Sequence, residues 1–239
     1  MGTILGKAVV DRARGTLVDP DRVRWTDLEL LGFLNDGQRQ IAIYRPDTSI
    51  GKIIFSLTVN STLQNIPATA SRLVKLTRNM GAGSTPGRPI RVGDQDELDR
   101  LTPEWHGSLG ASVRSFTYDG KTPRYFYVQP APSGTLFVEG FFQVSPTDCT
   151  MDGVGSGTTN SVISLDDVYS TVLHDYIVYR AKSKDGDAQN QPAASNSFNM
   201  FLHALGVKVV SDKAFDPNRT APPAPKAAPQ GAIDGQPTL

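Results

Sequence analysis

Apolar residues recur at helical spacing near the start of the chain and predict a helix over residues 3–16. A polar turn separates it from a second helical pattern that begins after Thr26. A threonine at this position can accept hydrogen bonds from the first turn, and Glu29, three residues later, completes a capping box. Pro46 disfavours helix at the residue before it and ends the element. The second helix supplies three residues that we expect in the core: Leu30, Leu34 and Ile41.

From about residue 48 the apolar spacing changes from helical to alternating. β-branched and aromatic residues predict strands at residues 53–59, 73–77, 113–118, 125–128 and 135–144. Asp119-Gly120 indicates a hairpin loop between two of them, and residues 94–101 suit a short helix. This part of the chain therefore predicts a small antiparallel sheet or sandwich.

Helical spacing returns after residues 151–161, a Gly/Ser/Thr-rich segment that we expect to be a flexible loop. One helix begins near Ser164, which can cap it. The next begins near Pro192, a favoured first-turn residue, and ends before Gly206. We expect these helices to pair as an antiparallel hairpin. Their core residues are predicted to be Tyr176, Phe198 and Phe201.

The order of the elements predicts an α+β protein. The simplest arrangement is an α-helical bundle formed by the N- and C-terminal helices, with an inserted antiparallel β domain and an extended C-terminal tail. The Pro/Ala-rich tail has almost nothing to bury, so it should be extended or disordered when free. The expected divisions are a helical bundle at 1–47 and 162–212, a β domain at 48–150, the flexible loop at 151–161 and the tail at 213–239.

The amino-acid composition argues against several classes of protein. Among 239 residues, Lys+Arg and Asp+Glu both number 24, which argues against a dedicated nucleic-acid binder but not against charge sorted onto separate faces. The single cysteine, Cys149, excludes an intrachain disulfide. The N-terminus has no signal pattern and no apolar run is long enough for a membrane span, so we expect a soluble protein made in a cytoplasm.

The residue types that carry catalysis are scattered along the chain. The three histidines, His106, His174 and His203, match no zinc-ligand spacing. The glycine-rich run at 153–158 lacks the Lys-Ser/Thr pair of a phosphate-binding loop. Asp166 and Asp167 suit the first turn of a helix, where its dipole favours negative charge. We therefore predict a non-enzymatic protein with no catalytic residue, no cofactor and no metal ion.

Charge is sorted along the predicted β domain. Residues 48–93 contain basic residues and no acidic one, whereas residues 94–104 are rich in carboxylates. Three interpretations remain open: a solvated domain beside an acidic helix, opposite charges that meet between neighbouring subunits, and a surface that faces DNA. The second interpretation gives candidate interface residues: Arg88, Arg91, Asp96 and Asp99.

A series of motifs resembles the head-to-tail adaptor (connector) proteins of short-tailed bacteriophages. The first spans residues 24–39, followed by Arg78-Asn79-Met80-Gly81, Pro103-Glu104-Trp105-His106, residues 173–185 and residues 201–206. The order and spacing of these motifs carry the resemblance, which covers about residues 4–206. The Pro/Ala-rich end lies outside it.

The resemblance implies a structural protein of the virion neck. Such adaptors form a ring, here of about twelve copies, below the portal protein. The ring extends the channel for double-stranded DNA, which passes without sequence recognition, and docks a tail or nozzle protein. No membrane is involved. We expect the C-terminal Pro/Ala-rich segment of this chain to bind the portal or an adjacent subunit. Its portal-docking residues are expected to be three prolines: Pro222, Pro223 and Pro225.

Two other classes of function stay open. One is another phage tail or capsid component with a similar set of helices and strands. The other is a glycan-binding or hydrolytic module, for which aromatic residues of the β part are the support: Tyr118, Tyr125 and Tyr127.

Overall fold

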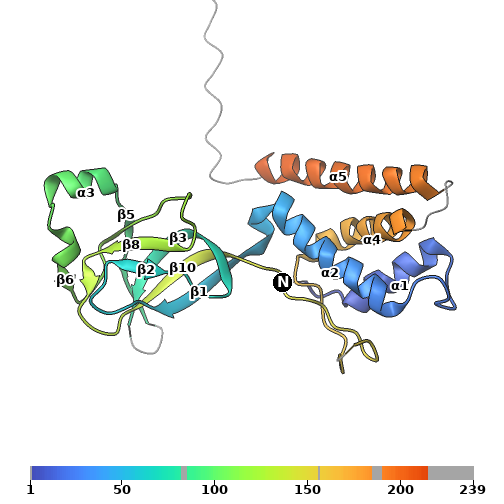
Figure 1. The fold of residues 1–239 in the computed structure, drawn as a ribbon, viewed down its shortest axis with the longest axis horizontal. Helices are drawn as coiled ribbons and strands as arrows, with labels where there is room; N and C mark the ends of the chain where they lie inside the picture. Colours follow the sequence, from blue (N-terminus) through green and yellow to red (C-terminus); the bar gives the residue numbers. More distant parts are fainter. Residues whose placement is uncertain (1, 82–84, 156, 185–189, 215–239) are drawn as a thin grey trace, which may run out of the picture.

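The computed structural model describes residues 2–81, 85–155, 157–184 and 190–214. The protein is α+β, as predicted, and its helices and strands form two parts that lie side by side (Figure 1). The helical part combines both ends of the described chain: α1 (Gly6–Leu17), α2 (Asp27–Tyr44), α4 (Ser170–Lys184) and α5 (Asn190–Ala214). The strands and the short helix α3 (Gln95–Leu101) come between them. The predicted tail at 213–239 lies, after Ala214, outside the described residues.

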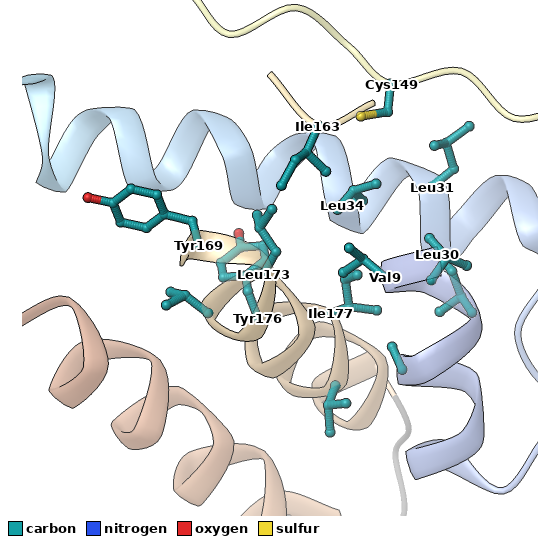
Figure 2. Packing of buried hydrophobic residues seen from close by; sticks show 14 of the residues in the cluster. Val9, Leu30, Leu31, Leu34, Cys149, Ile163, Tyr169, Leu173, Tyr176 and Ile177 are labelled. Carbon is teal, nitrogen blue, oxygen red and sulfur yellow. The ribbon is translucent and has the colours of Figure 1, made fainter. Parts of the chain in front are cut away.

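The four long helices share one cluster of buried side chains, with α4 in contact with α1, α2 and α5 (Figure 2). Where α2 and α4 cross, Gly37 lets them approach closely, because a Cβ added there would lie 2.9 Å from Tyr176 Cδ1. The residues expected in this core are placed as follows: Leu30, Leu34, Ile41, Tyr176 and Phe201 are buried, and Phe198 is partly buried against them.

Helix ends differ from the sequence expectations at three places. Thr26 accepts a hydrogen bond from the Glu29 amide (3.3 Å), but the Glu29 carboxylate binds Lys184 rather than returning to the cap. The start predicted at Ser164 was wrong: a 3₁₀ turn, η4 (Asp167–Tyr169), precedes α4, and the Ser164 hydroxyl accepts from the Thr147 amide (3.1 Å).

The predicted end of the last helix before Gly206 was also wrong. Helix α5 continues through this glycine to Ala214. An interior glycine costs only about 1 kcal/mol relative to alanine, and the following Val, Lys and Ala residues continue the helix. A glycine ends a helix only when the chain turns left-handed there.

The strands form a sandwich. One sheet has the order β1-β10-β3-β4 and the other β2-β8-β7-β5. Their bounds are β1 (Ile50–Ser56), β2 (Leu63–Asn65), β3 (Ala70–Met80), β4 (Pro86–Pro89), β5 (Arg91–Val92), β7 (Ser115–Thr117), β8 (Tyr125–Gln129) and β10 (Phe137–Val144). The rings of Phe55, Phe126 and Phe142 meet between the sheets, at 5.4–6.3 Å between centroids.

Most strand pairs are antiparallel, as expected, but two short pairs are parallel. β5 pairs with β7, and β6 (Leu109–Gly110) pairs with β9 (Ala131–Pro132). These pairs connect the segment around α3 to the sandwich at both of its ends. A short 3₁₀ turn, η1 (Pro46–Ser49), leads from α2 into β1.

The segment that returns from the β part packs on the helices. Cys149 and Met151, which the sequence assigns to the β domain and to the loop, belong to the buried helical cluster. The Asn35 side chain fixes this segment to α2: its oxygen accepts from the Cys149 amide (2.8 Å) and its nitrogen donates to the Cys149 carbonyl (3.2 Å). The helical core therefore begins before the expected boundary at residue 150.

Candidate functional site

Two of the three histidines, His106 and His174, have structural neighbours, whereas His203 is exposed on α5. His106 stacks on Trp105 with ring centroids 3.8 Å apart, and its Nδ1 lies 2.9 Å from Thr62 Oγ1. His174 Nδ1 lies 2.9 Å from Asp175 Oδ1, and its Nε2 lies 2.9 Å from Thr16 Oγ1. In the described part of the chain no three His, Cys, Asp or Glu side chains gather as metal ligands. None of its helices is long and apolar enough to cross a membrane.

The outer surface of the first sheet carries cations and apolar side chains in rows. Strand register places Lys52, Phe141 and Lys75 side by side across β1, β10 and β3. The neighbouring rows in the same register are Ile54, Glu139 and Arg78 on one side and Ile50, Gln143 and Arg72 on the other. Side chains directly opposite each other on one face of a sheet lie close enough to contact one another and to form a continuous surface. We call these nine residues the outer sheet face.

The outer sheet face has one carboxylate, and this carboxylate is already engaged. Thr77 donates to Glu139 Oε1 (2.9 Å), while Lys52 and Arg78 each lie 3.5 Å from a Glu139 oxygen. The Thr77 hydrogen bond, together with the nearby positive charge of Lys52 and Arg78, holds the pKa of Glu139 below its ordinary value. Four cations against one ionised carboxylate leave this face with a positive excess.

The opposite charge gathers around α3. We call residues 92–109 the acidic arm. Asp94 caps α3 by accepting from the Asp96 amide (3.0 Å), and Asp99 accepts from the Trp105 indole (2.7 Å). Trp105 is fully buried and anchors the arm to the sandwich. No residue of α3 itself is buried, and Val92 (72% exposed) and Leu101 (66% exposed) present apolar side chains to solvent.

The candidate interface residues occupy both regions without meeting. Arg88 on β4, Arg91 on β5 and Asp96 on α3 are exposed, and no ion pair within the described ranges joins the two arginines to Asp96 or Asp99. Asp99 has a structural role that the sequence did not reveal, because its partner is the Trp105 indole. Pro222, Pro223 and Pro225 lie outside the described residues.

Sequence reasoning missed the apolar members of the outer sheet face, Ile50, Ile54 and Phe141. A signal was present for two of them, since Ile54 lies between the inward residues Ile53 and Phe55, and Phe141 precedes the inward Phe142. Alternation marks two faces but does not say which one a second sheet will cover.

A cleft of about 220 Å³ lies on the second sheet near the start of α3. Tyr125, Tyr127 and Gln95 line it, and the Thr117 hydroxyl is buried there without a hydrogen-bond partner among the described residues. Tyr118, the third tyrosine that supported a glycan-binding or hydrolytic module, packs against the sandwich core instead. The structure therefore does not bring Tyr118, Tyr125 and Tyr127 onto one surface.

A family model described as SU10 adaptor protein matches residues 6–221. The chain belongs to this family. The match confirms the resemblance to phage head-to-tail adaptors, and it extends beyond the motifs into the start of the Pro/Ala-rich segment. No curated protein matches the chain. As an SU10 adaptor the protein is a structural component of a phage virion, and its family implies contacts with phage portal and tail proteins.

Proposed function

We propose that this SU10 adaptor forms a ring of about twelve copies below the portal, where it extends the DNA channel and docks a tail or nozzle protein. The observation that carries the proposal is the family match over residues 6–221, which spans the helical part and the sandwich together. The work of such a ring is mechanical: double-stranded DNA passes through the lumen without sequence recognition. Synthesis in the host cytoplasm precedes assembly into the virion.

The proposal assigns roles to the parts of the chain. The helical bundle (1–47 and 162–212) and the β domain (48–150) form the body of the subunit. The loop at 151–161 joins them, and Cys149 and Met151 at this junction pack on the helices. Charge between neighbouring subunits holds the ring: basic residues of the β domain of one copy, Arg88 and Arg91 among them, face the segment that carries Asp96 and Asp99 on the next. Heterologous contacts of this kind give a ring when the rotation between neighbouring copies closes.

Ring assembly is the first test. The full chain mixed with its portal protein should give a closed ring on the portal, visible end-on by electron microscopy. Adaptors that assemble on a template can be monomeric alone, so the free chain is the control. A chain that never associates with a portal or tail protein would contradict the proposal, and a ring of different symmetry would favour another phage tail or capsid component.

The C-terminal segment gives the second test. Proline holds a chain near extended conformations and removes amide donors, which suits an arm that runs along a partner. We propose that Pro222, Pro223 and Pro225 dock against the portal or an adjacent subunit. Truncation after Asp216 should leave the melting temperature unchanged, because the described buried residues end at Leu205, yet abolish portal binding in a pull-down.

A matched control keeps this second test specific. Replacing residues 217–239 with a Gly/Ser segment of equal length preserves chain length and removes only the proline-rich character. We expect it to behave like the truncation. Normal ring assembly by the truncated chain would end the arm hypothesis.

A further inference from the structure

The outer sheet face and the acidic arm lie on opposite sides of the β part. Val138 and Phe142 of the first sheet and Phe116 and Phe126 of the second fill the core between the sheets. The alternate residues Phe141 and Tyr125 therefore point outward on opposite surfaces. Gln95, at the start of α3, lines the cleft on the second of these surfaces, and Figure 1 shows α3 at the end of the β part that lies away from the helices. The start of α3 therefore lies on the other side of the sandwich from the outer sheet face of the same copy.

The two surfaces are complementary in charge. Lys75 and Arg72 on the face have no ion-pair partner in the described part of the chain, and neither do Asp96, Glu97 and Glu104 on the arm. The arm contains one cation, Arg100, against five carboxylates in residues 94–104. Opposite potentials of this kind orient two partners and exclude wrong ones.

The two surfaces are also complementary in apolar groups. On the face, Phe141 (37% exposed) lies between Lys52 and Lys75 and is flanked by exposed Ile50 and Ile54. On the arm, the exposed apolar residues are Val92, Leu101 and Leu109. Aromatic and aliphatic side chains ringed by polar ones are typical of the buried centre of a protein interface. A DNA backbone would engage the cations and leave these apolar side chains without contacts.

The form of α3 also indicates a missing partner. A seven-residue helix is too short to be stable by itself, since isolated helices below about 12–15 residues are marginal in water. Helices of this kind are held by packing of an apolar stripe, and in α3 only Leu98 is partly buried in its own chain. Leu101 on α3 and Val92 on β5 are therefore exposed to a second molecule.

We propose that the outer sheet face of one copy binds the acidic arm of the next, so that this head-to-tail contact joins adjacent subunits. The proposal deepens the proposed function and rests on it for the ring, because the ring requires a contact between unlike surfaces. The named contact is tested on the free chain at concentrations where it self-associates, and on rings assembled on the portal. Since the two surfaces lie on opposite sides, one chain cannot satisfy itself, and each copy offers a surface to each neighbour.

Charge reversal in the full-length chain tests the contact. Lys75→Glu on the face and Glu97→Lys on the arm should each weaken self-association roughly tenfold or more in analytical ultracentrifugation at low salt. The difference should shrink at high salt, because exposed charges are screened. The double variant Lys75→Glu/Glu97→Lys should recover association. Lys182→Glu, on α4 of the helical part, is the matched control and should change nothing.

Disulfide trapping tests the geometry. The native Cys149 is buried, so introduced surface thiols should react selectively. A mixture of Phe141→Cys and Leu101→Cys chains should form a mixed disulfide dimer, whereas Leu63→Cys, exposed on the opposite sheet, should not cross-link to Leu101→Cys. If the free chain is monomeric, the same pairs are trapped in rings assembled on the portal.

The outcomes separate this inference from the proposed function. If a ring forms on the portal but Phe141→Cys and Leu101→Cys cross-link neither in the free chain nor in the ring, the proposed contact is wrong and the proposed function stands. A cross-linked pair in the free chain without any ring on the portal overturns the proposed function alone. Reduced binding of duplex DNA by Lys75→Glu, with unchanged self-association, would make the outer sheet face a DNA surface and overturn the contact.

Discussion

Replacing Asn79 by alanine should destabilise the β part by about 3–5 kcal/mol. Asn79 is 5% exposed on β3, and its Nδ2 donates to the carbonyl oxygens of Arg88 (2.9 Å) and Val113 (2.8 Å). Its Oδ1 accepts from the Val113 amide (2.8 Å). The side chain therefore ties β3 both to the edge strand β4 and to the segment that leads into the second sheet. Alanine leaves three backbone groups without this partner, each at about 1–3 kcal/mol when buried.

The measurement is chemical denaturation with hydrogen exchange as a local readout. Exchange should accelerate around β3, residue 88 and residue 113, and should change little in α4, which belongs to the separate helical core. Asn65→Ala is the matched control, because Asn65 is exposed on β2 and surface changes usually stay within about 0.5 kcal/mol. A loss below about 1 kcal/mol at Asn79 would mean that water replaces its hydrogen bonds.

Asn79 also shows what a motif alone does not explain. Arg78-Asn79-Met80-Gly81 supports the adaptor resemblance, but nothing in the spacing of apolar residues assigns the asparagine a structural role. Its partners lie 9 and 34 residues further along the chain. A bond of this kind depends on the tertiary fold, so local patterns cannot predict it.

The helices were predictable because their signals are local. The stripe through Leu30, Leu34 and Ile41 has the period of an α-helix, and each of these side chains is buried. The threonine cap of α2 is also local and is present. The prediction that the Glu29 side chain returns to the cap was wrong because its carboxylate binds Lys184, which lies 155 residues away in sequence.

The short strands gave no comparable signal. β4 begins and ends with proline, and β5 has only two residues, so neither shows alternation. Both are held by pairing with longer strands. The charge pattern was visible in the sequence, but it pointed to Arg88 and Arg91. The register of β1, β10 and β3 is what gathers Lys52 and Lys75 around Phe141.

Phe201→Ala should cost about 3–5 kcal/mol in the free energy of unfolding, as removal of a large buried aromatic side chain does. Phe201 is fully buried, and its ring meets those of Tyr176 (5.3 Å between centroids), Phe198 (5.9 Å) and Tyr44 (6.1 Å). This aromatic group joins α5 to α4 and α2. Because little else in the described part of α5 is fully buried, the cavity should loosen this helix first.

The neighbouring Met200→Ala is the matched control, since Met200 is 60% exposed on the same helix and its loss leaves no cavity. Tyr176→Ala should resemble Phe201→Ala, because it removes the α4 side of the same ring contact. In the double variant the two losses should be less than additive, since each single change already removes the shared contact. Urea denaturation of the unmodified chain, the two single aromatic variants and the double variant measures this coupling. A loss below about 1 kcal/mol at both aromatic positions would mean that α5 does not use this face to hold the bundle.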